Sequence, residues 1–182
     1  AVGNLLDSIF FLYAYWLAVK FIMIIETLPK IVGMFAFALW DKKELCLHLV
    51  RDRFGEKPLY YGWSGRPHKN AFVFGSELDA IKAYKNFNNA ISKKAIEQYL
   101  NFSYIPAPLS IHESIFKLSP GHILSFRTQS NTMNNTAWWN FTSMAVNAKE
   151  KPLKSEGEAT EAIEAQLKNS ITEQTITDVP LG

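Results

Sequence analysis

The stretch at residues 33–62, GMFAFALWDKKELCLHLVRDRFGEKPLYYG, limits most strongly what this chain folds into. Residues 35–40 are apolar at odd and even positions alike, which predicts a β-strand covered on both faces. Residues 44–49 alternate leucine with Glu, Cys and His, which predicts a second strand with one more polar face. The polar residues 41–43 between them are typical of a hairpin turn, so an antiparallel sheet is expected here.

Turn signals and capping residues divide much of the remaining chain into further strands and helices. Ser76-Glu77-Leu78-Asp79 has the S-x-x-D form of a helix start, and Ser92 is placed to cap a second helix. Residues 131–136 are rich in asparagine, which favours an exposed loop, and residues 138–141 resume an extended apolar run. The expected strands are residues 59–61, 71–74 and a paired unit of 115–118 with 121–127, and the expected helices are residues 77–84 and 93–100.

The composition is that of a soluble globular protein, with 48% hydrophobic and 20% charged residues. A formal net charge of +2, without any Lys/Arg-rich run, argues against a nucleic-acid partner. Cys46 is the only cysteine, so an intramolecular disulfide is impossible and a cysteine-based zinc site is not expected. A chain of 182 residues suffices for one domain, or for one domain and the start of another.

An unusually apolar segment, Ile9–Ile25, contains Lys20 as its single charged residue. Its length approaches the roughly 20 residues that span a bilayer. A lysine near the centre of such a span would cost about 2.5–3.5 kcal/mol. A buried helix running on toward Gly33 is therefore favoured over a membrane anchor, and residues 1–27 are assigned to a separate apolar helical segment.

The chain changes character near residue 150. Residues 148–154 are charged and lack an apolar pattern, as in a linker. Ser155-Glu156-Gly157-Glu158 then forms a capping box that opens an amphipathic helix. The apolar stripe of this helix consists of Ile163, Leu167 and Ile171. We therefore predict one domain over residues 28–147, and a linker with the start of a second domain over residues 148–182.

Five motifs carry a resemblance to a known enzyme family. They are GMFAFALWD (33–41), RDRFGEKPLYYG (51–62), FGSELDAI (74–81), YIPAPLSIHESIFKLSPGH (104–122) and ITDVPLG (176–182). In this order they resemble the glutamine-hydrolysing asparagine synthetases, which are class II, N-terminal-nucleophile amidotransferases. The first three resemble the later part of the glutaminase domain, the fourth its linker side, and the fifth the approach to the ATP-pyrophosphatase loop. The resemblance covers residues 28–182.

The resemblance implies both a fold and a reaction. The implied fold is α+β: part of a four-layer αββα sandwich, a linker, and the first helix of an α/β ATP-pyrophosphatase domain. The full-length enzyme is expected to hydrolyse glutamine, pass ammonia through an internal tunnel and activate aspartate with ATP and Mg²⁺. Its products are asparagine, glutamate, AMP and pyrophosphate. A cytoplasmic location and pairing of two copies are expected, without nucleic acid or membrane as a partner.

The resemblance also implies that this chain is inactive by itself. The family's nucleophile is an N-terminal cysteine activated by its own α-amino group, which the internal Cys46 cannot replace. The glutamine-binding segments belong upstream of the matched residues. The S-G-G-x-D-S pyrophosphate loop would follow Gly182, and Asp178, Val179, Pro180, Leu181 and Gly182 would lead into it. No catalytic, metal-binding or cofactor-binding residue is therefore assigned within the chain.

Five residues are candidates for a domain interface or an ammonia passage. Ser76, Glu77 and Leu78 resemble family positions near the ammonia passage, with a plain helix cap as the competing interpretation. Arg51 and Asp52 resemble family residues near the join between domains. An ordered pair and a solvated charged loop both stay open for them. None of the five is expected to do chemistry.

Other residues with chemical potential favour structural roles. Cys46 alternates with leucines, as expected of a buried structural thiol. Trp138 and Trp139 lack the basic surroundings of a stacking platform, so core packing is expected. The four histidines share no metal-ligand spacing. They are His48, His68, His112 and His122.

Two alternatives stay open for the function. The chain would serve as a non-catalytic interaction domain of the same sandwich ancestry, tethered to a membrane through Ile9–Ile25 or free of it. The helix after Ser155, followed by an approach strand, argues against that alternative, since a separate module has no use for it. A relative that closes another amide bond, such as a β-lactam ring, would share every feature of this chain, because the substrate domain is not part of it.

Overall fold

The computed structural model describes residues 23–65, 71–150 and 152–175. The chain divides into two compact units, residues 1–32 and 33–182. In the first unit the described residues form a helical segment over 23–27 and a short 3-10 helix, η1 (Leu28–Lys30). The rest of the predicted apolar helix lies outside the described residues. Within the described ranges, no helix has the length and apolarity needed to cross a membrane.

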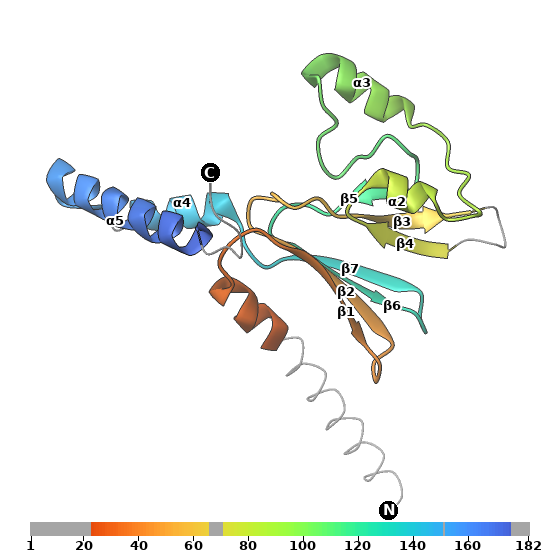
Figure 1. Cartoon of the computed structure of the whole chain (residues 1–182), viewed down its shortest axis with the longest axis horizontal. Helices are drawn as coiled ribbons and strands as arrows, with labels where there is room; N and C mark the ends of the chain where they lie inside the picture. The colour runs from red at the N-terminus through yellow and green to blue at the C-terminus, as the bar shows by residue number, and fades with distance from the viewer. Residues whose placement is uncertain (1–22, 66–70, 151, 176–182) are drawn as a thin grey trace, which may run out of the picture. The chain divides into compact units, whose positions relative to one another are not determined.

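The second unit is built on two antiparallel sheets, seen edge-on in Figure 1. One sheet has the strand order β1-β2-β6-β7, and the other has the order β4-β3-β5. The strands are β1 (Ala36–Asp41), β2 (Cys46–Arg51), β3 (Tyr60–Ser64), β4 (Ala71–Gly75), β5 (Ile115–Lys117), β6 (His122–Arg127) and β7 (Thr132–Ala137).

The hairpin predicted around residues 41–43 joins β1 to β2, and Asp41 pairs with Cys46 at its end. The Asp41 carboxylate accepts hydrogen bonds from the backbone N–H groups of Lys43, at 2.9 Å, and Glu44, at 3.2 Å. This is an Asx-type turn, in which a side chain replaces a backbone acceptor. The sequence signal for the hairpin is thereby confirmed.

The strand buried on both faces is β2, not β1. β1 lies at the edge of its sheet, with Leu39 42% and Trp40 43% exposed, so the predicted two-sided cover is wrong for the described part of the chain. β2 lies between β1 and β6, and its supposedly polar face is buried as well, with Cys46 1% and His48 8% exposed. Burial raises the pKa of the Cys46 thiol and lowers the pKa of His48, which keeps both groups neutral.

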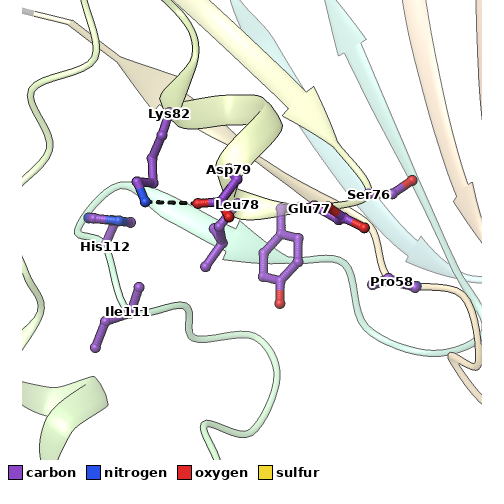
Figure 2. Close-up of a pocket in the computed structure, with 9 residues that line it drawn as sticks. Pro58, Ser76, Glu77, Leu78, Asp79, Lys82, Ile111 and His112 are labelled. Atoms are coloured by element: carbon purple, nitrogen blue, oxygen red, sulfur yellow. Dashed lines mark hydrogen bonds and ion pairs between the residues drawn. The ribbon is translucent and has the colours of Figure 1, made fainter.

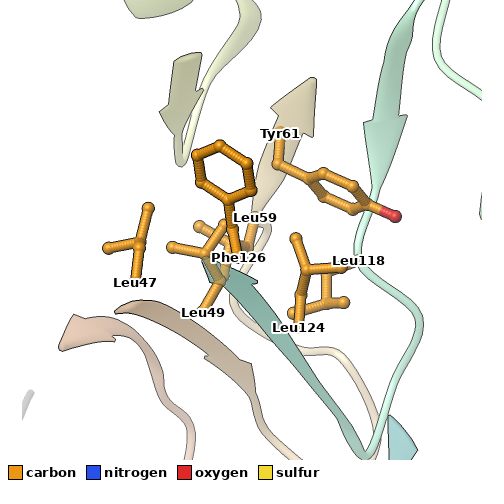
Figure 3. Close-up of a cluster of buried hydrophobic side chains, with 7 residues drawn as sticks. All are labelled: Leu47, Leu49, Leu59, Tyr61, Leu118, Leu124 and Phe126. Atoms are coloured by element: carbon orange, nitrogen blue, oxygen red, sulfur yellow. The ribbon is translucent and has the colours of Figure 1, made fainter. Parts of the chain in front are cut away.

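The hydrophobic core lies between the two sheets (Figure 3). The ring of Phe126 on β6 stacks on Phe72 of β4 with 4.4 Å between centroids, and it meets Trp63 of β3 edge-on at 5.6 Å. These contacts join the sheets face to face. The buried cluster consists of Leu47, Leu49, Leu59, Tyr61, Leu118, Leu124 and Phe126.

The segments 115–118 and 121–127 do not form the paired unit that the sequence predicts. β5 pairs with β3, whereas β6 pairs with β2 and β7, so the chain passes from one sheet to the other between them. At the crossing, the backbone N–H of Leu118 donates to the Leu59 carbonyl and that of Gly121 donates to the Asp52 carbonyl, each at 2.8 Å. Each strand therefore completes a different layer of the sandwich.

The asparagine-rich residues 131–136 form a strand, not the predicted loop. β7 pairs with β6 along its whole length, and most of its side chains are exposed. Polar residues are tolerated there because an edge strand keeps one side toward solvent. The predicted extended run at residues 138–141 is also wrong at its end, because a helix, α4 (Phe141–Lys149), begins at Phe141 with Asn140 as its N-cap.

Three further helices are present in the described residues: α2 (Leu78–Lys82), α3 (Lys93–Phe102) and α5 (Glu156–Gln174). The caps predicted for two of them are confirmed. The Ser92 hydroxyl accepts from the Ala95 N–H at 3.3 Å, and the Ser155 hydroxyl accepts from the Glu158 N–H at 3.2 Å. The second unit thus combines helices with antiparallel sheets, which confirms the α+β class.

Candidate functional site

The loop at residues 51–58 is held in one conformation by the side chain of Arg51. Its guanidinium donates to three backbone carbonyls: Nε to Lys57 at 2.8 Å, Nη1 to Leu118 at 2.6 Å, and Nη2 to Gly55. The planar fork of arginine suits this arrangement, because its donors point in fixed directions. Arg51 therefore joins both ends of the loop to the chain crossing at Leu118.

Asp52 complements this by accepting hydrogen bonds from the same loop. Its carboxylate accepts from the backbone N–H groups of Phe54 at 3.1 Å and of Glu56 and Lys57 at 3.0 Å each. The residue is only 1% exposed. Burial by itself would raise the pKa of the carboxyl, but the backbone N–H donors outweigh it and hold the pKa below its ordinary value. Asp52 is therefore a charged group stabilised by backbone amides.

Gly55 is required by the same packing. Its φ of +69° lies in the left-handed region, and a Cβ there would lie 2.8 Å from Cγ of Pro120 and 2.9 Å from Cζ of Arg51. Trp138 closes the other side, since its indole Nε1–H donates to the Arg51 carbonyl at 3.1 Å. Arg51 and Asp52 thus belong to an ordered loop, in which each side chain binds backbone groups.

Ser76, Glu77 and Leu78 follow directly after β4, where the chain turns into α2. Glu77 occupies the N-cap position of α2, but no side chain there makes the hydrogen bond that a capping role would involve. Instead the three residues line one pocket of about 480 Å³ (Figure 2). The full lining is Pro58, Tyr60, Ser76, Glu77, Leu78, Asp79, Lys82, Ile111 and His112.

Charged groups surround this pocket. Lys82 Nζ lies 2.8 Å from the Asp79 carboxylate, and this hydrogen bond lowers the pKa of Asp79. On the same side as Lys82 in Figure 2, the His112 ring packs edge-on against Phe87 with 4.9 Å between centroids. Its Nδ1 is buried and has no hydrogen-bond partner among the described residues. The pocket therefore offers both a cation and carboxylates, together with an imidazole nitrogen.

The structure brings together three of the five predicted site residues, namely those of the pocket. Arg51 and Asp52 do not line the pocket. The loop that they hold ends at Pro58, and Pro58 does line the pocket. The sequence did not single out Asp79, Lys82 or His112 as partners of this site. The i,i+3 spacing of Asp79 and Lys82 is a readable signal on a helix, whereas the placement of His112 comes from the fold alone.

The structure also shows where most of the other residues discussed from the sequence lie. Cys46 is buried in β2, which confirms the structural interpretation. Trp138 and Trp139 are half-buried, and Trp139 meets Phe54 edge-on at 5.1 Å. His68 and the approach segment 178–182 lie outside the described residues. Where the chain is described, no group of three or more His, Cys, Asp or Glu side chains is arranged to hold a metal ion.

Two stacked antiparallel sheets with an ordered 51–58 loop are consistent with a glutamine amidotransferase domain. A family model described as a glutamine amidotransferase domain matches residues 22–139. The chain belongs to this glutamine amidotransferase family. The resemblance found from the motifs is thereby confirmed.

Relatives of known name narrow this class. A putative asparagine synthetase [glutamine-hydrolyzing] 2 of Methanocaldococcus jannaschii is 34% identical over 152 residues, which is 82% of this chain. The asparagine synthetase [glutamine-hydrolyzing] 3 of Bacillus subtilis is 29% identical over 150 residues. A protein of Gibberella zeae named amidase chry2 is 28% identical over 150 residues. The chain spans 28%, 22% and 21% of the length of these three relatives.

Proposed function

We propose that this chain is part of a glutamine-dependent asparagine synthetase. In the proposed reaction, glutamine is hydrolysed to glutamate and ammonia, and the side-chain carboxylate of aspartate attacks ATP to give an aspartyl adenylate and pyrophosphate. Ammonia then displaces AMP, which yields asparagine. The match of residues 22–139 to the glutamine amidotransferase model, together with relatives named asparagine synthetase, carries the proposal.

We assign residues 28–147 to the later part of the glutaminase domain. The two sheets would be the inner layers of an αββα sandwich, and the core between them supports this assignment. Residues 148–182 would be a linker and the first helix of the synthetase domain. The exposed stripe of α5 supports this second assignment, because an apolar stripe calls for a partner surface. Its members Ile163, Leu167 and Ile171 are 61%, 58% and 60% exposed.

In this proposal the 51–58 loop and the pocket beside α2 have a positioning role. Arg51 and Asp52 fix the loop at the join between the two domains, and the loop in turn fixes Pro58 on the pocket wall. Ser76, Glu77 and Leu78 would lie along the route of ammonia. None of these side chains is asked to exchange a proton or to form a bond.

ATP and Mg²⁺ are expected in the full-length enzyme. The described residues provide no cluster suited to a metal ion, and the segment predicted to approach the nucleotide, residues 178–182, lies outside them. The proposal therefore assigns no residue of this chain to the nucleotide or the metal.

The test uses the protein that contains this chain, isolated intact from its source. With amide-¹⁵N glutamine, aspartate, ATP and Mg²⁺, we expect ¹⁵N-asparagine together with AMP and pyrophosphate in equal amounts. Ammonium in place of glutamine should also support the reaction, which separates the synthetase step from glutamine hydrolysis. Failure to form asparagine from either nitrogen source would overturn the proposal.

One relative is named amidase chry2, so an acceptor other than aspartate should also be tested. A different carboxylate in place of aspartate would leave the glutaminase part unchanged, so AMP release should be measured with a panel of carboxylic acids. The remaining alternative is a non-catalytic interaction domain, with or without a membrane tether. It predicts no AMP release with any acceptor, and fractionation of cell membranes would decide on the tether.

A further inference from the structure

The pocket beside α2 is lined by charged groups of both signs. Figure 2 shows Lys82 and His112 on one side, Ser76 and Pro58 on the other, and the side chain of Leu78 between them. Glu77 is directed toward the side of Pro58. The volume of about 480 Å³ falls within the range of small-molecule sites.

Lys82 is available to a ligand despite its contact with Asp79. The two side chains are 49% and 85% exposed, and an ion pair in that setting contributes little because water solvates both charges. A ligand carboxylate is able to share or take over the ammonium at small cost. Lys82 therefore provides an anion-binding position at this end of the pocket.

His112 provides a second polar group at the same end. Its backbone N–H donates to the Ser110 hydroxyl at 3.2 Å, and its ring is packed against Phe87, so the imidazole is held in place. The buried Nδ1 nevertheless has no hydrogen-bond partner in the part of the chain that is described. Buried polar atoms are almost always bonded, so this nitrogen calls for an ordered water molecule, which would carry a hydrogen bond from the imidazole toward the pocket.

Glu77 provides the opposite charge. It occupies the N-cap position of α2, yet its carboxylate caps no helix N–H. No hydrogen bond or ion pair of this carboxylate is found among the residues that the structure describes. A carboxylate left without a partner at the rim of a pocket is suited to bind an ammonium group. Leu78 then supplies an apolar surface between the two charged positions.

We propose that this pocket binds a free zwitterionic amino acid. The ligand carboxylate would bind Lys82 directly and the His112 imidazole through a water molecule, the ligand ammonium would bind Glu77, and an aliphatic side chain would lie on Leu78. None of these residues belongs to the glutamine-binding segments, which the resemblance assigns upstream. The proposal uses no step of asparagine synthesis, and a ligand bound here would lie beside the route proposed for ammonia.

The test is a calorimetric titration of the full-length protein with L-leucine, in the absence of ATP and aspartate. N-acetyl-L-leucine lacks the ammonium and L-leucinamide lacks the carboxylate, so each should bind at least about tenfold more weakly. Glu77→Gln and Lys82→Met should each weaken leucine binding by a similar factor. Both side chains are on the surface, so these variants are expected to fold normally.

Matched control variants distinguish a loss of binding in the pocket from a general effect of removing surface charge. Glu113→Gln and Lys85→Met remove exposed charges that do not line the pocket, and they should leave leucine binding unchanged. The proposal is overturned if leucine shows no saturable binding up to about 10 mM. It is equally overturned if N-acetyl-leucine binds as well as leucine, or if neither pocket variant weakens binding. The binding titration uses no step of the synthetase assay. A negative titration would therefore overturn this proposal and leave the proposed function untouched.

Discussion

The carboxylate of Asp52 is buried, yet it stays charged because three backbone N–H groups donate to it. Arg51 does the converse by donating to carbonyls of the same loop. Together they replace the hydrogen bonds that a loop without regular structure would otherwise lack. The sequence motif RDRFGEKP therefore encodes a rigid loop, with Gly55 where a side chain would collide.

Asp52→Asn should lower the free energy of unfolding by about 1.5–3 kcal/mol at pH 7, since the amide cannot accept the same three bonds with a full charge. The folded-state pKa of Asp52 lies below its ordinary value of 3.8. Its stabilising effect is therefore complete above that value and is lost as the pH falls through the lower folded-state pKa. Urea denaturation of both proteins from pH 7 to pH 3 should show the difference between them shrinking below pH 3.8.

Glu56→Gln is the matched control, because Glu56 is an exposed carboxylate in the same loop. It should change stability by no more than about 0.5 kcal/mol at either pH. An Asp52→Asn variant as stable as the control at pH 7 would contradict the role given to Asp52.

Gly62→Ala should be severely destabilising, by about 3 kcal/mol or more. Gly62 has a φ of +156°, and a Cβ on it would lie 2.0 Å from the Ser114 carbonyl oxygen. Backbone atoms cannot yield there without disturbing the pairing of β3 with β5. Gly75→Ala is the control, since its Cβ would meet no atom closer than 3.6 Å. Equal melting temperatures for the two variants would show that the close approach is not a real constraint.

At the scale of elements, the difference between β1 and β2 follows from their places in the sheet. Both strands are apolar enough to be central, but among the strands that the structure describes β2 has a neighbour on each side and β1 has one neighbour, β2. Leu49→Ala in β2 should cost about 2–5 kcal/mol, because Leu49 is fully buried in the core. Leu39→Ala in β1 removes a leucine that is 42% exposed, and it should cost less than about 1 kcal/mol. Chemical denaturation of the two variants compares them directly, and a larger loss in Leu39→Ala would reverse the assignment of edge and centre.

The sequence was sufficient for local structure and insufficient for long-range pairing. The β1–β2 hairpin and the caps at Ser92 and Ser155 depend on neighbours within a few residues, and they were predicted correctly. The separation of β5 and β6 into different sheets depends on β3 and β2, which lie far away in sequence. No local pattern around Pro120 carries that information.

The same division applies to the candidate site. Ser76, Glu77 and Leu78 are consecutive, so a motif was enough to place them together. The part of the lining that contains His112 comes from a segment more than thirty residues later and is brought in by tertiary structure. Pairing with Ile91 in an isolated bridge fixes its position, and that pairing has no signature in the sequence.

At the scale of the whole molecule, the rate at which a reagent modifies the buried Cys46 thiol measures how often the fold opens. Cys46 lies in the central strand β2 and is 1% exposed, and burial raises its pKa, so it is neither accessible nor a thiolate in the native state. An aromatic disulfide reagent such as DTNB should therefore modify it at least about a thousandfold more slowly in native buffer than in urea. Cys46→Ser should leave the proposed glutamine hydrolysis by the full-length protein unchanged, because the thiol is structural. Rapid modification of the native protein would instead place Cys46 at an accessible surface and would contradict both the two-sided burial of β2 and its structural role.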